Sequence, residues 1–131
     1  MAKFGYTIIY ASDVNETPVF FEKTFGMKRR FMTQEEDYGE LETGETTLAF
    51  ASHELGESNF SGGYISGSDS QKPLGTEIAL VVDDVQIIHD TALKHGSHEL
   101  KAPEQKPWGQ VVSYLRAPSG VLIELCTPMA K

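Results

Sequence analysis

The segment VLIELC, residues 121–126, places one carboxylate, Glu124, among apolar residues. A short run of β-branched and aliphatic residues bounded by a turn predicts a strand buried in a sheet. A charge taken out of water destabilises a protein unless it is paired. We therefore expect Glu124 to face solvent, to have a partner or to serve a function.

The segments around VLIELC repeat an earlier part of the chain. The pattern twice predicts strand, helix, strand, strand and strand, at a nearly constant offset. The expected elements are strands 6–12, 27–33, 38–43 and 46–52 with helix 17–25, and strands 77–82, 98–101, 109–115 and 121–126 with helix 85–95. The sequence thus predicts two tandem βαβββ modules, residues 4–52 and residues 76–128.

The two modules are joined by residues 53–75, which are rich in Gly and Ser and show almost no hydrophobic periodicity. This composition predicts a long loop. Long loops in compact domains are often lids over binding sites. The alternative is a mobile connector, and the composition does not separate the two.

Alternation along the predicted strands places chemically distinct residues on the two sheet faces. Ile123 and Leu125 share one face of the last strand, which should pack on the helices. By the repeat, Tyr6 corresponds to Glu77, and Ala49 corresponds to Glu124. The other face, the expected wall of a cavity, collects Tyr6, Ile8, Tyr10, Ala49, Ala51, Glu77, Ala79, Glu124 and Cys126.

Composition limits the classes of partner. The chain has 131 residues, a net charge of -8 and one cysteine. An acidic chain is a poor ligand for nucleic acid or an anionic membrane, and its one basic cluster, Lys28-Arg29-Arg30, is too short to change that. No apolar run is long enough to span a bilayer. The start of the chain lacks the features of a signal peptide, and a lone cysteine suits a reducing compartment. We therefore expect a cytoplasmic protein in which Cys126 is a small buried residue.

At this point a family is identifiable. The paired modules, the last strand GVLIEL (120–125), the turn Pro107-Trp108-Gly109 and the strand EIALVVDDV (77–85) resemble the vicinal oxygen chelate superfamily. That superfamily includes glyoxalase I, bleomycin and fosfomycin resistance proteins, and extradiol dioxygenases. The resemblance implies an α+β fold, with a curved mixed sheet around a cavity and helices on the outer face. It also implies one domain over residues 1–131 and a homodimer.

The resemblance further implies a divalent metal held at four positions, which are Tyr6, Ala49, Glu77 and Glu124 in this sequence. Glu124 matches the usual ligand type. The phenol of Tyr6 stays protonated near neutral pH, with a pKa of about 10, and Ala49 has no ligand atom. Glu77 and Glu124 with waters suit Mg²⁺ or Mn²⁺ and make a poor Zn²⁺ or Ni²⁺ site. We expect no cofactor, with a divalent metal (Mg, Mn, Ni or Zn) as the alternative.

The histidines offer little to such a site. His53 follows Ala49 on the same face by alternation, and is either a third ligand or an exposed residue at the start of the loop. The other three, His89, His95 and His98, belong to the second helix and its exit, and are expected to be surface or packing residues.

Without a metal, Glu77 and Glu124 would share a partly apolar site, so that one pKa rises and the two titrate as a unit. They could then bind a cationic or amine-bearing ligand beside Tyr6, or one could act as a general base. Alternatively they are merely hydrogen-bonded structural residues. These two glutamates are the candidate catalytic residues.

Aromatic side chains could supply flat surfaces for a planar ligand. The candidates are Trp108, Tyr114, Phe60 and Tyr64, although Trp108 and Tyr114 could equally fill the core. Arg116 could meet an anionic group, but a surface salt bridge is the simpler expectation. The complete predicted ligand-binding set is Tyr6, Ile8, Ala49, Glu77, Trp108, Tyr114 and Glu124.

Three functions follow from these observations. The first is a small-molecule-binding protein of the glyoxalase/bleomycin-resistance type without the usual metal centre. The second is a divalent-metal-dependent lyase or isomerase of the glyoxalase I type that uses Glu77 and Glu124. The third is a non-catalytic scaffold or regulatory module.

Overall fold

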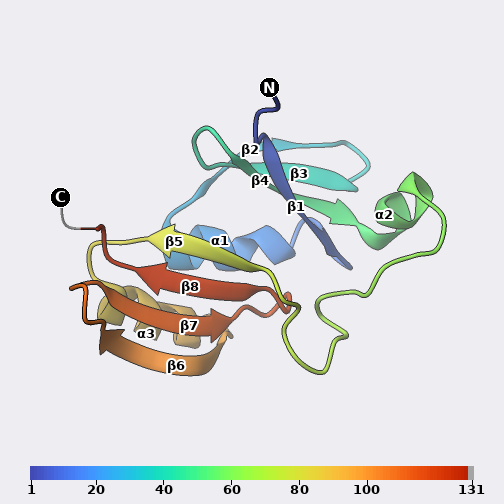
Figure 1. The fold of residues 1–131 in the computed structure, drawn as a ribbon. Helices are drawn as coiled ribbons and strands as arrows, with labels where there is room; N and C mark the ends of the chain where they lie inside the picture. Colours follow the sequence, from blue (N-terminus) through green and yellow to red (C-terminus); the bar gives the residue numbers. More distant parts are fainter. Residues whose placement is uncertain (130–131) are drawn as a thin grey trace. The chain divides into compact units, whose positions relative to one another are not determined.

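The structure, a computed structural model, describes residues 1–129. The chain divides into two compact units, residues 1–66 (unit 1) and residues 67–131 (unit 2). Each unit contains one four-stranded sheet with both parallel and antiparallel neighbours (Figure 1). The α+β fold with two repeated modules is therefore as the sequence predicts.

Unit 1 comprises β1 (Tyr6–Ala11), α1 (Thr17–Phe25), β2 (Lys28–Met32), β3 (Tyr38–Glu42), β4 (Thr47–Ser52) and α2 (His53–Asn59). Its strand order is β1-β4-β3-β2. The first strand runs parallel to β4, whereas β3 pairs antiparallel with β4 and with β2. This parallel pairing is possible because α1 and the two following strands form the crossover between β1 and β4.

The helix α1 packs on its sheet through aromatic side chains. Pro18 lies in its first turn, and Gly26 ends it in a left-handed conformation with φ 70°, which glycine adopts without steric cost. The ring of Phe21 lies 5.4 Å from that of Phe50 on β4. Both rings are buried, so this contact anchors the helix to the middle of the sheet.

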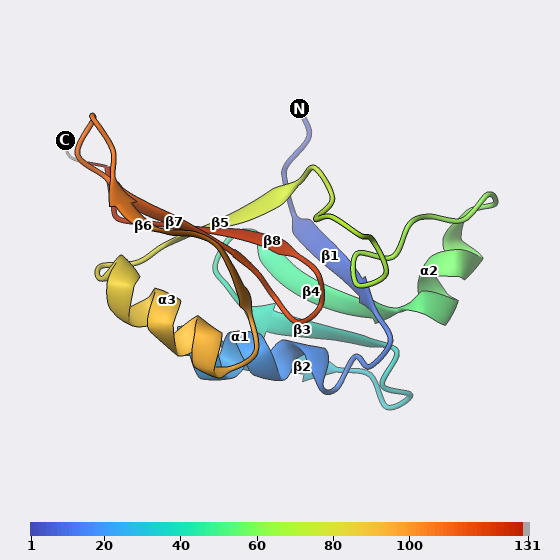
Figure 2. The same cartoon turned by 90° about the horizontal axis from the view of Figure 1, so that it is seen from below.

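Unit 2 repeats the arrangement. It comprises β5 (Glu77–Val81), α3 (Val85–Lys94), β6 (His98–Gln105), β7 (Val111–Arg116) and β8 (Leu122–Cys126), in the strand order β5-β8-β7-β6. The side chain of Asp84 caps α3 by accepting a hydrogen bond from the Ile87 amide, as a helix N-cap does. Figure 2 shows α3 along one face of this sheet, where Leu115, Ile123 and Leu125 are buried.

Strand pairing confirms the predicted register of the repeat. Ile8 is paired with Ala49 in unit 1, and Ala79 is paired with Glu124 in unit 2. Ala49 and Glu124 therefore occupy equivalent positions. The sequence repeat, although each of its matches is weak, therefore predicts which side chains share a strand face.

The prediction of a loop over residues 53–75 was wrong at its start, because α2 occupies His53–Asn59. The hydroxyl of Ser52 caps this helix by accepting a hydrogen bond from the Leu55 amide. The strand β6 also extends four residues beyond the predicted 98–101. Within residues 1–129, none of the helices has the length and hydrophobicity to cross a membrane.

Candidate functional site

Glu124 lies on β8, which is flanked by β5 and β7. Its register partners on these strands are Ala79 and Tyr114. Glu77 precedes Ala79 by two residues and so lies on the same sheet face. The Tyr114 hydroxyl donates a hydrogen bond to Glu124 Oε1 at 3.0 Å. The structure thus brings together three predicted site residues from three adjacent strands.

Burial and the closeness of the two carboxyls change the pKa values of the side chains at this site. The pKa of Glu77 is raised by burial, by its hydrogen bond to Glu124 and by charge repulsion. The hydrogen bond to Glu124 also raises the pKa of Tyr114. Cys126 is buried, as expected, and the pKa of its thiol is raised by burial and by Glu124. Protons are therefore held more tightly at Glu77, Tyr114 and Cys126 than in free side chains.

The acidic pair is not neutralised by an ion pair within residues 1–129. In the described part of the chain, no Lys, Arg or His forms an ion pair with Glu77 or Glu124. The two carboxyls of unit 2 can therefore share one proton or accept a positively charged group from outside the chain.

The residues on this face offer few ligands for the divalent metal that the family resemblance implies. Across residues 1–129, no group of three or more His, Cys, Asp or Glu side chains is placed to hold a metal ion. Glu77 and Glu124 provide two carboxyls, and zinc and nickel sites require more protein donors than this pair offers. The pair therefore does not fit zinc or nickel, whereas two carboxyls with waters are compatible with Mg²⁺ or Mn²⁺.

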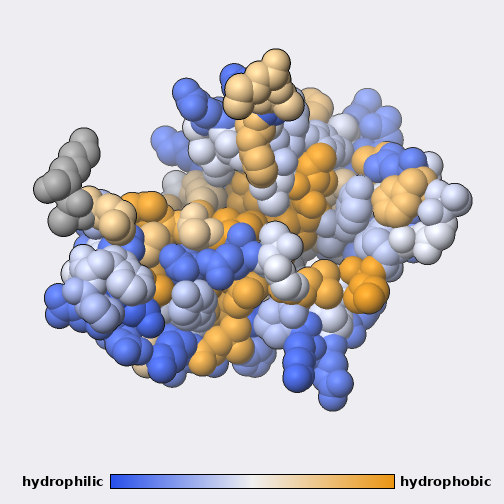
Figure 3. Space-filling model, in the orientation of Figure 1, coloured by the Kyte–Doolittle hydropathy of each residue, from blue (hydrophilic) through white to orange (hydrophobic). Residues whose placement is uncertain are grey.

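The module-one candidates lie on the equivalent face of unit 1. Tyr6 and Ile8 are on β1, where 58% and 45% of their surfaces are exposed, and Ala49 on β4 is buried. Figure 3 shows hydrophobic side chains gathered around β1. This face of unit 1 therefore carries two large exposed side chains on β1 beside a small buried residue on β4.

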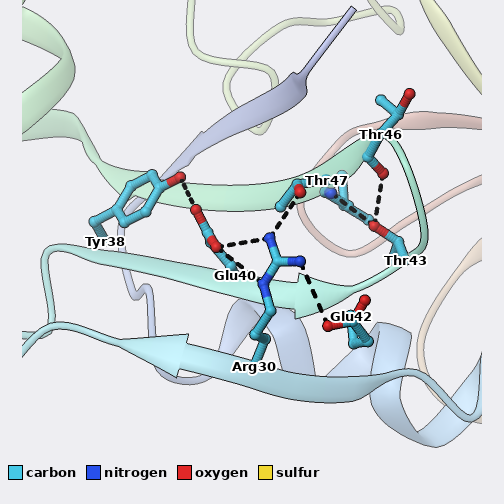
Figure 4. Close-up of polar contacts among 8 residues, drawn as sticks. Arg30, Tyr38, Glu40, Glu42, Thr43, Thr46 and Thr47 are labelled. Carbon is cyan, nitrogen blue, oxygen red and sulfur yellow. Dashed lines mark hydrogen bonds and ion pairs between the residues drawn. The ribbon is translucent and has the colours of Figure 1, made fainter.

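Sequence reasoning missed a polar cluster on this face (Figure 4). Glu40 on β3 lies directly opposite Ala49 in the strand register. It accepts hydrogen bonds from Tyr38 at 2.7 Å and from Arg30 at 2.8 Å, and Arg30 also donates to the Thr47 hydroxyl. The hydrogen bond from Tyr38 is the main cause of a lowered pKa of Glu40.

Unit 1 therefore has a carboxylate, Glu40, next to Ala49, which itself has no ligand atom. This carboxylate is already paired with Arg30 and Tyr38. Alternation of Tyr38, Glu40 and Glu42 along YGELET was the available signal. The missing information was the exact register of β3 on β4 and the position of Arg30 on the neighbouring strand β2, which local patterns do not give.

Two of the remaining candidates lie elsewhere. Trp108, in the turn between β6 and β7, is 58% exposed and donates to the side chain of Gln110, so of its two predicted alternatives the core-filling one was wrong. Contrary to prediction, Arg116 forms no salt bridge within residues 1–129. It donates instead to the backbone carbonyls of Gly67, Ser70 and Gly120.

The histidines divide as follows. His53 is half-buried rather than exposed, and its Nδ1 lies 2.6 Å from the Tyr64 hydroxyl. His89 is buried between Ser113 and Glu99, and is a packing residue as predicted. His95 and His98 are exposed, which also agrees with the prediction.

Comparison with known proteins gives a consistent picture. The family model described as "Glyoxalase/Bleomycin resistance protein/Dioxygenase superfamily" matches residues 3–125. No curated protein matches the chain.

Solved structures resemble the chain over nearly its whole length. A glyoxalase-related enzyme from Fulvimarina pelagi is 15% identical with a TM-score of 0.81, over 98% of this chain and 89% of that chain. A superfamily member from Sphaerobacter thermophilus DSM 20745 is 23% identical with a TM-score of 0.70, over 98% of both chains. A bleomycin resistance determinant encoded on transposon Tn5 is 19% identical with a TM-score of 0.63, over 98% of this chain and 100% of that chain. At these low sequence identities, the likeness shows a shared fold and nothing further.

Proposed function

Because this chain belongs to the glyoxalase/bleomycin resistance protein/dioxygenase superfamily, we propose that it binds a small molecule without the metal centre of catalytic relatives. The ligand carries a protonated amine that the carboxyls of Glu77 and Glu124 accept on the exposed face of unit 2. The observation that carries the proposal is this carboxyl pair, with which no Lys, Arg or His of residues 1–129 forms an ion pair.

The surroundings of the pair support an ammonium group as the ligand's anchor. Glu124 already receives one hydrogen bond from Tyr114, which fixes the orientation of its carboxylate and leaves acceptor positions free. An ammonium group placed between the two carboxyls would donate to both and remove their mutual repulsion. A neutral ligand of the same shape would gain neither effect.

Thermal unfolding with matched ligands tests the proposal. Benzylamine and benzyl alcohol have similar shapes, and the first is cationic at neutral pH. We expect benzylamine to raise Tm with a concentration dependence that follows RT ln(1 + [L]/Kd), and benzyl alcohol to have no such effect. Equal shifts with both compounds, or with neither, would contradict the proposal.

A matched pair of variants tests the site. Glu124→Gln should abolish the shift with benzylamine. Glu45→Gln, which removes the same charge from an exposed position in unit 1, should retain it. Elemental analysis of the purified protein tests the metal-free part of the proposal: one equivalent of metal that is lost in Glu124→Gln would overturn it.

The proposal also includes the assembly and the location of the protein. It is a cytoplasmic homodimer: the family resemblance implies the dimer, and the single cysteine supports a reducing compartment. Sedimentation equilibrium measures the assembly: a mass of twice 14.5 kDa is expected, and a monomer at all concentrations would contradict it.

A further inference from the structure

An aromatic cluster in unit 1 is separate from the carboxyl pair. It consists of Tyr10 on β1, His53 on α2, and Phe60 and Tyr64 in the segment after α2, and we call it the α2 aromatic cluster. The Tyr64 ring is its centre, with ring centroids 4.7 Å from Tyr10, 5.8 Å from His53 and 6.4 Å from Phe60. The rings of His53 and Tyr64 are stacked at an interplanar angle of 27°.

Polar contacts hold these rings in place. The Tyr64 hydroxyl lies 2.6 Å from His53 Nδ1, and the Asn59 amide donates to the Tyr10 hydroxyl at 3.4 Å. A Cβ at Gly56 would lie 2.9 Å from the Tyr10 ring, so glycine lets this ring lie directly against α2. The ring surfaces are therefore fixed before any ligand arrives, which lowers the entropic cost of binding.

The cluster is open to solvent on one side. Phe60 is 49% exposed, and Tyr10, His53 and Tyr64 are each half-buried. A fully structural cluster would bury its rings, because their burial is the source of its stability. Exposed aromatic faces beside fixed rings are typical of surfaces on which planar groups stack.

The charges on the segment that carries most of the cluster have one sign. Residues 31–71 contain no Lys or Arg. Glu54 and Glu57 lie on α2, and after burial the charge of Glu57 is the largest cause of the raised pKa of Tyr64. Aromatic faces attract cations through the ring quadrupole, and nearby carboxylates add to that attraction.

We propose that the α2 aromatic cluster binds a planar organic cation, whose ring stacks on the exposed faces of Phe60 and its neighbours and whose charge is complemented by Glu57. Every residue named lies in unit 1. The proposal is therefore independent of the amine site at Glu77 and Glu124, and either can fail without the other.

Two probes separate stacking from charge. N-methylquinolinium and quinoline have nearly the same ring, and at pH 7.5 only the first is charged. Titration followed by the NMR signals of the aromatic side chains should give saturable binding of N-methylquinolinium, with shifts at Tyr10, Phe60 and Tyr64. Quinoline should bind more weakly by about two- to fivefold, as expected for a cation on an exposed ring.

Matched variants locate the site. Phe60→Leu should weaken N-methylquinolinium binding by at least the same factor, whereas Phe4→Leu, at another exposed phenylalanine of unit 1, should not. Glu57→Gln should weaken it by about two- to fivefold, and Glu35→Gln, an equal charge change in an exposed turn, should not. Glu124→Gln should leave it unchanged.

Three outcomes would overturn the proposal. These are the absence of saturable binding, equal affinity for the charged and neutral probes, and equal loss of binding in Phe60→Leu and Phe4→Leu. The last outcome would mean that the probe binds exposed phenylalanine without using the fixed rings.

Discussion

Glu40 and Glu124 show how the neighbours of a carboxylate determine what it can do. Glu40 is matched by the guanidinium of Arg30 and the phenol of Tyr38, so its charge is already used within the fold. Glu124 has a similar phenol, Tyr114, but its other neighbour is a second acid. The first carboxylate stabilises its sheet, and the second remains available to a ligand.

Replacing Glu77 by Gln should change how stability depends on pH. Because the pKa of Glu77 is raised in the folded state, its stabilising contribution is complete below the ordinary glutamate pKa of about 4.3. That contribution is lost as the pH rises through the raised value. Unfolding by urea between pH 4 and 7 should therefore show wild type losing stability relative to Glu77→Gln. Parallel curves for the two proteins would contradict this.

Ser113, His89 and Glu99 are connected in the order of a hydrolase triad, with distances of 2.9 Å and 2.7 Å. Ser113 is 0% exposed and His89 is 1% exposed, so no substrate can reach the hydroxyl. We expect no adduct with a serine-reactive fluorophosphonate. Ser113→Ala should lower the free energy of unfolding by about 1–3 kcal/mol, because His89 Nδ1 loses its buried partner.

The control for that variant is Ser12→Ala, at an exposed position, which should have little effect on unfolding. Labelling of the folded protein at Ser113 would show that the cluster is accessible and would contradict its structural role.

At the scale of elements, Arg116 ties the segment before β5 to the end of β7. Its guanidinium donates to the carbonyls of Gly67, Ser70 and Gln71, while its Nε donates to Gly120. Backbone carbonyls need hydrogen-bond donors, and this one guanidinium supplies several of them, which holds the loop in one conformation. Residues 67–71, which belong to the predicted loop, are therefore held by hydrogen bonds to Arg116, and the same side chain holds the neighbouring turn at Gly120.

Gly120 and Gly109 have similar backbone angles. The same substitution at both therefore measures how much the close approach of Gly120 to Gly67 contributes to stability. Gly120 has φ 92° and Gly109 has φ 101°, so Ala is strained at both positions, by about 1–3 kcal/mol. A Cβ at Gly120 would lie 2.1 Å from the Gly67 carbonyl oxygen, but one at Gly109 meets nothing within 4 Å. Gly120→Ala should be more destabilising than Gly109→Ala in urea unfolding, and should speed proteolysis near residue 67. Equal losses would show that the approach of the two backbones is unimportant.

The helix α2 was not predictable from its own sequence, HELGESN. It lacks an apolar stripe, contains a glycine and is short, and each property argues against an isolated helix. Ser52 caps its start, and Gly56 lies close to the ring of Tyr10 on β1, which is a contact between residues distant in sequence. By contrast α1 and α3, with apolar spacing and end signals, begin where they were predicted.

At the scale of the whole molecule, internal repetition made the fold predictable. The repeat fixed which residues share a sheet face, and so predicted that Glu77 and Glu124 lie together. It did not place Tyr114 beside them, because Tyr114 was expected either to offer a flat surface or to fill the core. It also could not give Glu40, since the two modules differ in this cluster. Strand faces were thus accessible to sequence reasoning, whereas the cross-strand partners of each carboxylate were not.

The net charge of -8 should itself be measurable in stability. Excess charge of one sign destabilises the compact state by self-repulsion, and salt screens it. Raising NaCl from about 10 mM to about 150 mM, where the Debye length falls from about 30 Å to about 8 Å, should raise Tm. A fall in Tm would show that the ion pairs around Arg30 outweigh the general repulsion.

The position of Glu40 opposite Ala49 also limits what residue 49 can become. A glutamate at residue 49 would place two acids directly across a strand pair, at a position that is fully buried, and like charges so placed are destabilising. Introducing a carboxylate ligand on β4 would then require the Glu40 carboxylate to be removed first. The order in which these two positions can change is thus fixed by the strand register.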